Sequence, residues 1–159
     1  MSSTEMKLDK AETFYNRDAV RMDSRTMYIF TDNTDRDSGK GEIPDDSWYA
    51  KKYGSGKHYP RYTSAVIRGL DNAYPITTQR WYNKRCKGIY GRWHDEDIEE
   101  FKKVIDEDFD EICKNAGRYE RIIFPFNGIF NTKIANISKE RTPVLYEYLF
   151  EKCKILLGI

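Results

Sequence analysis

The sequence lacks long hydrophobic runs and a dominant charge sign. No apolar stretch is long enough to span a bilayer, and residues 1–10 are polar, without the apolar core of a signal peptide. Lys and Arg number 27 against 26 Asp and Glu, which leaves a net charge of +1. No global field therefore favours nucleic acid or an anionic membrane surface. We expect a cytoplasmic protein that does not act at a membrane.

Cysteine and histidine are scarce and scattered. The three cysteines, Cys86, Cys113 and Cys153, form no CxxC pair. This odd set argues against a disulfide framework and against a zinc site. Cys113 and Cys153 fall on apolar faces of expected helices, where cysteine packs as a small hydrophobe. His58 and His94 have no metal-ligand spacing, so we expect neither a metal nor a cofactor.

Two short apolar runs dominate what is present. Residues 25–31 and 121–126 each have the layout of a buried strand followed by a polar turn. Residues 73–78 are typical of a third strand, and Pro75 indicates either a strand end or a position at the sheet edge. The order of strands and helices predicts a single α/β domain with a small mixed or parallel sheet flanked by helices.

We place this domain at residues 25–159, after a polar amino-terminal segment at residues 1–24. Residues 1–10 are expected to be loose, and residues 11–22 form either a short helix, with Phe14 and Val20 facing the body, or an extended arm.

Two helices are predicted in the second half of the chain. The clearest covers 95–116, where Asp95 is a candidate N-cap and apolar residues recur at helical spacing. Thr142 followed by Pro143 predicts the start of the last helix, with the cap first and proline at the first helical position. Residues 32–62, by contrast, form a long polar loop, which is unusual unless the loop is functional or disordered.

Polar side chains follow the first strand directly. They are Asp32, Asn33 and Thr34. In open α/β sheets small ligands bind outside the carboxyl ends of the strands, so these side chains are placed to bond a base or a ribose. Alternatively, Asp and Asn at this position only form an Asx-turn. Both interpretations are open at the level of sequence.

The turn after the second apolar run is another candidate site. It contains Gly128, Ile129, Phe130 and Asn131. Gly128 permits close approach of the backbone to a ligand, and successive N–H groups can form an anion nest. The alternative is a tight turn that buries Ile129 and Phe130. This segment lies beside Asp32 if the two strands are neighbours in the sheet.

Basic residues flank the third expected strand, which ends at Thr78. Arg68 precedes this strand and Arg80 follows it, and an arginine can clamp a phosphate with two hydrogen bonds. The alternative for each is a solvated or structural arginine. The Gly-Lys-Gly run at 39–41 is either a phosphate-binding turn or an ordinary flexible one, because its spacing matches no known phosphate-binding loop.

The loop at residues 80–93 mixes basic and aromatic residues and contains no acid. Such a loop can stack the bases of a single-stranded nucleic acid and neutralise its backbone. The alternative is a surface loop anchored by Trp81 and Trp93. A nucleic-acid or protein-interaction module therefore remains an alternative function.

Several segments resemble a poorly characterised family of phage and bacterial proteins. That family carries a Phe-Gly-Asp-Asn strand end and an Arg-Gly-x-Pro-Asn-Ala segment. Here residues 30–33 read Phe-Thr-Asp-Asn and residues 68–73 read Arg-Gly-Leu-Asp-Asn-Ala, so Thr31 replaces the family's Gly and Asp71 its Pro. The resemblance covers most of the chain from Met27 onward. It implies kinship but no particular activity.

The element order is also similar to that of macro domains, in particular the small divergent ones. That resemblance implies an ADP-ribose site in which Asp32 and Asn33 approach the adenosine and residues 128–131 the phosphates. Phe130 and Asn131 stand where a Gly-rich loop is typical, and no lysine matches the nucleophile of the divergent hydrolases.

We therefore expect a protein that binds a small, ADP-ribose-like nucleotide as its partner. If a phage encodes the chain, such binding would sequester or degrade a defence signal in the host cytoplasm. The first alternative is an ADP-ribosyl or nucleotide hydrolase on the same scaffold, with water activated by Asp32 or Asp35. The second alternative is the interaction module based on residues 80–93. The oligomeric state is left open.

Overall fold

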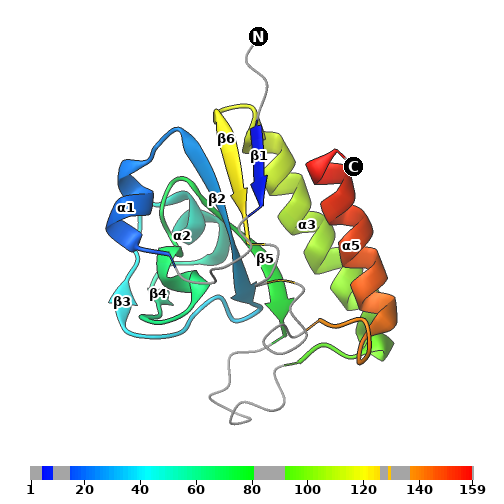
Figure 1. The fold of residues 1–159 in the computed structure, drawn as a ribbon. Coiled ribbons are helices and arrows are strands. Elements are labelled where there is room, and N and C mark those ends of the chain that lie inside the picture. Colours follow the sequence, from blue (N-terminus) through cyan, green and yellow to red (C-terminus); the bar gives the residue numbers. More distant parts are fainter. Residues whose placement is uncertain (1–4, 9–14, 81–91, 126–128, 130–136, 159) are drawn as a thin grey trace.

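A four-stranded parallel sheet forms the centre of the computed structural model, which describes residues 5–8, 15–80, 92–125, 129 and 137–158 (Figure 1). The strand order is β1-β6-β2-β5, and all three neighbouring pairs are parallel. The bounds are Glu5–Leu8 for β1, Thr26–Asn33 for β2, Ala73–Gln79 for β5 and Arg121–Phe124 for β6. The predicted α/β fold with a small sheet is confirmed.

Helices cover both faces of this sheet (Figure 1). One face carries α1 (Arg17–Met22), α2 (Trp48–Tyr53) and the 3-10 turn η1 (Ser64–Ile67), and the other carries α3 (Ile98–Ala116) and α5 (Pro143–Leu157). Strand β2 is buried on both sides: Met27 and Ile29 join the cluster under α3 and α5, and Phe30 joins the cluster under α1 and α2. A strand buried on both faces explains why this run is apolar throughout.

Strand β5 forms an edge of the sheet, one of the two positions that Pro75 indicated. It pairs only with β2, and Pro75 lies opposite Phe30 in the register. A proline is tolerated here because an edge strand does not need every N–H group for pairing.

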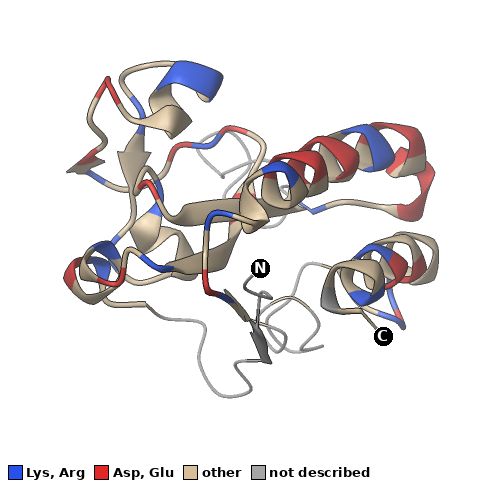
Figure 2. Ribbon diagram, turned by 90° about the horizontal axis from the view of Figure 1, so that it is seen from above, with Lys and Arg blue, Asp and Glu red and all other residues tan. Residues whose placement is uncertain are grey.

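Helix α3 buries the predicted stripe, including Phe101, Ile105 and Ile112, and acidic residues predominate along the rest of its length (Figure 2). The prediction that Asp95 caps this helix is wrong. Asp95 begins a 3-10 turn, η2 (Asp95–Asp97), and its Oδ1 accepts from the N–H groups of Val144 and Leu145, 3.2 Å from each. Its carboxylate thus caps α5 from another element.

Thr142 is the N-cap residue of α5, as predicted, but its side chain makes no capping hydrogen bond to the helix. Its hydroxyl donates to the carbonyl oxygen of Ser138, 3.1 Å away, and accepts from the Ser138 N–H. Pro143 does stand at the start of the helix, as predicted. The sequence pattern located the helix start correctly, but the capping carboxylate lies about fifty residues away in the chain.

The long loop predicted at residues 32–62 contains regular structure. Strands β3 (Gly41–Glu42) and β4 (His58–Tyr59) pair antiparallel, and α2 lies between them. These elements have two to six residues each, too short for a periodic pattern to emerge in the sequence. A local signal was present: the Ser47 hydroxyl accepts from the Ala50 N–H and caps α2.

The amino-terminal segment is part of the same fold. Strand β1 (Glu5–Leu8) pairs with β6, and Val20 of α1 is buried in the cluster under α1 and α2. The expectation of a loose segment is therefore wrong for residues 5–8, whereas the short helix expected as one alternative within residues 11–22 is present as α1, with Val20 buried. Cys153 is buried as expected, whereas Cys113 is exposed on α3, and Cys86 lies outside the described residues. Across the described part of the chain, no helix combines the length and apolarity that crossing a membrane requires.

Candidate functional site

Strands β2 and β6 lie side by side in the sheet, which confirms that the two apolar strands are neighbours; Thr26 to Tyr28 pair with Arg121 to Ile123, so β2 continues past the end of β6. After β2 the chain enters the layer of α2 and η1, whereas after β6 it continues to α5 on the opposite face (Figure 1). Adjacent parallel strands whose connections diverge to opposite faces define a topological switch point, where α/β proteins bind their ligands. The carboxyl edge of these strands is therefore the candidate site.

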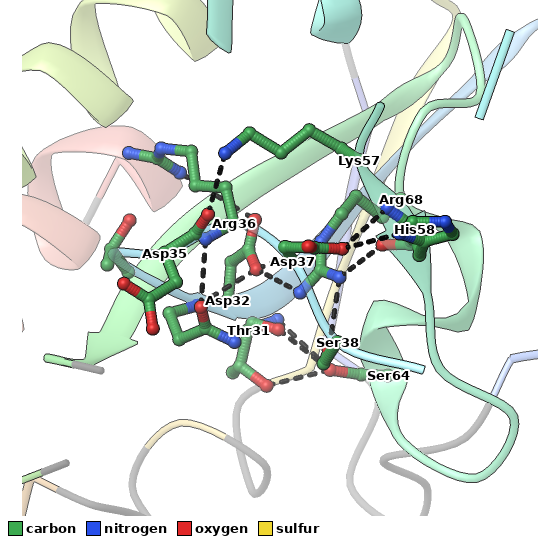
Figure 3. Close-up of polar contacts among 12 residues, drawn as sticks. Thr31, Asp32, Asp35, Arg36, Asp37, Ser38, Lys57, His58, Ser64 and Arg68 are labelled. Atoms are coloured by element: carbon green, nitrogen blue, oxygen red, sulfur yellow. Dashed lines mark hydrogen bonds and ion pairs between the residues drawn. The ribbon is translucent and has the colours of Figure 1, made fainter. Parts of the chain in front are cut away.

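A buried carboxylate closes the end of β2. Asp32 Oδ1 accepts from Arg68 Nη2 at 2.5 Å and from Arg68 Nε at 3.2 Å (Figure 3). Its Oδ2 accepts from the Tyr49 hydroxyl at 2.5 Å and lies 3.6 Å from Arg36 Nη1. The side chains of Asp32 and Arg68 are both 0% exposed. Both oxygens of Asp32 are thus engaged by the chain itself, so a ligand cannot reach this carboxylate without disrupting the fold.

A second buried carboxylate balances the charges. Asp108 of α3 accepts from the Thr77 N–H of β5 at 2.8 Å and from Arg36 Nη2 at 3.4 Å. Together with Arg68, these groups form the network named here the buried ionic cluster: Asp32, Arg36, Arg68 and Asp108. Two acids and two bases leave the cluster neutral, which is what burial of charged groups requires.

The cluster fixes the turn that follows β2. Arg36 has φ +54°, an uncommon value for a residue with a side chain. Its N–H donates to the carbonyl and side-chain oxygens of Asn33, at 3.0 and 2.8 Å, and its guanidinium stacks on Tyr53, 3.9 Å from the ring centroid. These contacts hold residues 33–36 in one conformation.

The two carboxylates of the cluster differ in pKa. Burial alone would raise the pKa of Asp32, but Arg68 and Arg36 outweigh it and the pKa lies below its ordinary value. For Asp108 burial outweighs the opposing effect of Arg36, and the pKa is raised to about 6. Asp32 therefore stays ionised at neutral pH, while Asp108 exchanges a proton in mildly acidic conditions.

The two segments that carry the sequence resemblance meet in this cluster, because Asp32 belongs to one and Arg68 to the other. Asn72, also in the second segment, donates its Nδ2 hydrogens to the carbonyl oxygens of Val20, Asp23 and Thr26, at 2.9 to 3.1 Å. These contacts give the motif residues structural roles.

Most of the predicted site residues that the structure describes are buried. Asn33 and Thr78 are 5% and 4% exposed, and Asn33 forms the Asx-type contact to Arg36 described above. Thr34 is half-buried, and its N–H donates to the carbonyl oxygens of Gln79 and Arg80. Thr34 thus joins the turn after β2 to the end of β5.

The remaining predicted residues divide between the core and the surface. Arg80 pairs with Asp97 at 3.2 Å and with Glu100 at 2.8 Å, so it holds the end of β5 to the start of α3. Ile129 is buried in the core, and its N–H donates to the Pro125 carbonyl. Gly128, Phe130 and Asn131 lie outside the described residues.

The two loops proposed for phosphate or nucleic acid have packing roles where they are described. A Cβ on Gly39 would lie 2.4 Å from Pro60, and one on Gly41 would lie 2.3 Å from the Tyr59 ring, so close packing explains both glycines. Trp93 is buried, and its Nε1 donates to the Thr77 carbonyl at 3.3 Å. This fits the anchoring interpretation for Trp93, while Trp81 lies outside the described residues.

Residues 10–152 match the model of a family of unknown function, DUF7831. The chain belongs to this family. No curated protein and no solved structure matches it. The described part of this DUF7831 protein contains no group of three or more His, Cys, Asp or Glu side chains suited to hold a metal ion.

Sequence reasoning missed a histidine–aspartate pair in this DUF7831 protein. Asp37 Oδ1 lies 3.0 Å from His58 Nδ1 and accepts from the His58 N–H at 2.8 Å (Figure 3). His58 and Lys57 line an open groove of about 460 Å³ beside β3 and β4, together with Glu42 and Asp45. The pair spans 21 residues of sequence, and no motif signalled it.

Asp108 was missed as well, although the sequence contained a signal for it. This acid stands next to Phe109 within the apolar stripe of α3, three residues after Ile105 and four before Ile112. An acid on the buried face of a helix needs a partner in the core.

Proposed function

We propose that this DUF7831 protein binds a small nucleotide of the ADP-ribose type at the carboxyl edge of β2 and β6. The observation that carries the proposal is the topological switch point between these strands, since ligands of open α/β sheets bind at such points. The resemblance of the element order to macro domains supports the choice of ligand. In a phage-encoded protein, such binding would sequester a nucleotide signal of host defence.

The buried ionic cluster assigns revised roles to the predicted residues. Asp32 and Arg68 hold the turn after β2 and do not contact the ligand, because their side chains are fully buried. Thr34, at the junction of β2 and β5, is placed to face it. A turn held in one conformation before binding lowers the entropic cost of association, which favours affinity.

The substitution Thr34→Asp tests this site. We expect binding of ADP-ribose to weaken at least about tenfold, because the new carboxylate repels the diphosphate at close range. Titration calorimetry on the wild type and the variant measures the effect. The melting temperature should change little, because the Thr34 side chain is half-buried and makes no hydrogen bond within the described residues.

Ser55→Asp is the matched control, since it adds the same charge at an exposed loop position between α2 and β4. Its affinity for ADP-ribose should equal that of the wild type. The proposal fails if Thr34→Asp binds as tightly as the wild type, or if the wild type binds none of ADP-ribose, NAD and the cyclic nucleotides.

A second candidate function is hydrolysis of the bound nucleotide, and the Asp37–His58 pair favours it. A carboxylate on Nδ1 orients a histidine so that Nε2 can accept a proton. Nε2 of His58 has no hydrogen-bond partner among the described residues. In this scheme Nε2 takes a proton from water, the hydroxide attacks phosphorus, and the bridging P–O bond breaks with its electron pair leaving on the departing phosphate.

If hydrolysis occurs, His58→Gln should lower the turnover of labelled ADP-ribose at least about a hundredfold, the usual contribution of a general base. Binding of the nucleotide should persist. His94→Gln, at the other histidine, is the control. Equal turnover in the wild type and His58→Gln would eliminate this scheme and leave the binding proposal intact.

A further inference from the structure

A groove with three arginines lies at the amino edge of the sheet, opposite to the candidate nucleotide site. It is bounded by α1, by the segments that precede β2 and β5, and by the residues after α3, and its volume is about 560 Å³. Figure 2 looks onto this edge of the sheet. Arg17 and Arg21 come from α1 and Arg118 follows α3, while Ser24, Asp46 and Asp71 are among the other lining residues.

Arg17 is the most informative of these residues. Its Nη1 donates to the carbonyl oxygens of Val66 and Arg68, at 2.8 Å each, and its guanidinium stacks on Tyr59, 3.7 Å from the ring centroid. These contacts immobilise the group and leave Nε and Nη2 without a hydrogen bond to the described residues. The Arg17 guanidinium is thus held in place with one edge available to a ligand.

No carboxylate of the described residues lies within 4.0 Å of the Arg17 guanidinium. Burial lowers the pKa of Arg17; Tyr59 opposes this effect, and Arg21, one helical turn away, adds to it. The three other arginines that lie against the core, Arg36, Arg68 and Arg80, each pair with Asp or Glu. Buried charges in proteins are normally paired, whereas among the described residues no carboxylate forms an ion pair with Arg17; Asp18, which pairs with Arg21, acts on it from farther away.

We propose that this groove binds a phosphorylated sugar, with the phosphate on the three arginines. The planar guanidinium fork matches two phosphate oxygens at once, and three such groups line this groove. Asp46 and Asp71, exposed in the same lining, are acceptors for sugar hydroxyls, and their charge disfavours a polyanion. The volume lies within the range of about 300–1,000 Å³ typical of small-ligand sites.

Calorimetry with ribose 5-phosphate, ribose and inorganic phosphate tests the proposal. We expect ribose 5-phosphate to bind, inorganic phosphate to bind more weakly, and ribose to show no heat. The double variant Arg21→Glu/Arg118→Glu should weaken the binding of ribose 5-phosphate at least about tenfold, because each charge-assisted hydrogen bond contributes more than a tenfold effect on affinity. Both side chains are exposed, so the fold should persist.

Lys103→Glu/Lys139→Glu is the control, since it reverses two charges at exposed positions away from the groove. Its affinity should equal that of the wild type. In addition, the Nε–Hε signal of Arg17 in a ¹⁵N spectrum should shift on addition of ribose 5-phosphate and not on addition of ribose.

The outcomes separate this site from the carboxyl edge. The groove is supported if Thr34→Asp keeps the wild-type affinity for ribose 5-phosphate and Arg21→Glu/Arg118→Glu loses it. This holds whether or not ADP-ribose binds. The reverse pattern overturns the groove and leaves the proposed function standing. Equal loss in Arg21→Glu/Arg118→Glu and in the lysine control would show a non-specific charge effect and would also overturn it.

Discussion

Replacing Arg68 by methionine is expected to destabilise the fold by about 3–5 kcal/mol, the cost of leaving a buried charge without its main partner. Asp32 would remain fully buried, with the Tyr49 hydroxyl, the Asn33 N–H and the more distant Arg36 as its remaining partners. Arg68 Nη1 also donates to the Ser38 hydroxyl at 3.1 Å and to the His58 carbonyl at 2.6 Å, and both acceptors would be left unpaired. Unfolding in urea, followed by circular dichroism, measures the change in free energy.

Two further variants distinguish the effect of breaking the buried ion pair from the effect of removing an arginine in general. The double variant Asp32→Asn/Arg68→Met should cost less than the sum of its two single changes, because the uncompensated charge is absent. Arg25→Met removes a partner of Glu120 at the surface, where the side chains are 78% and 62% exposed. Its cost should stay below about 1 kcal/mol. A loss below 1 kcal/mol for Arg68→Met as well would contradict a structural role for the cluster.

The sheet was largely predictable because β2 is buried on both faces and β6 carries a run of apolar residues. Residues 25–31 and 121–126 stood out for that reason. Pro75 was consistent with the edge position of β5, because proline lacks the N–H group that pairing on both sides would need. The short elements β3, α2 and β4 escaped prediction, because their stability comes from tertiary packing of Tyr49 and Ala50 rather than from a repeating pattern.

The candidate site was predictable in position but not in the roles of its residues. Sequence placed Asp32 and Arg68 near strand ends, where both a ligand contact and a buried ion pair are possible. The choice between them depends on which side chains meet across 36 residues of chain, and no local pattern contains that information. The same holds for Asp95, whose partners lie in α5.

The buried ionic cluster also joins parts of the fold that carry separate candidate functions. Arg68 contacts Asp32 at the end of β2 and the carbonyl of His58 in β4, so one side chain connects the carboxyl edge to the Asp37–His58 pair. Arg36 continues the connection to Asp108 in α3. A change in the charge of one member should therefore affect the whole edge, which makes Asp108 a sensitive position.

Asp108 is expected to make the stability of the fold decrease as pH rises from about 4 to about 6. Its pKa is about 6 in the fold and 3.8 as the ordinary value, so between these values the folded state binds a proton that the unfolded state has released. Stability falls with rising pH wherever the folded state binds more protons. A shift of about two pH units corresponds to about 3 kcal/mol across the window. Asp32 acts in the opposite sense, because its lowered pKa gives stability that is lost only as the pH falls below the ordinary value.

The substitution Asp108→Asn isolates this effect. The amide oxygen of asparagine can still accept from the Thr77 N–H, but the side chain no longer titrates. The variant should lack the loss of stability that Asp108 causes between pH 4 and 6. Its free energy of unfolding, relative to that of the wild type, should therefore rise by about 3 kcal/mol across that window. Urea unfolding at several pH values measures this difference in free energy, in which the contributions of the other titrating groups cancel. Asp110→Asn, at an exposed position of the same helix, should keep the slope of the wild type. A parallel pH dependence in Asp108→Asn and the wild type would mean that Asp108 is ionised throughout, with Arg36 stabilising its charge more than burial opposes it.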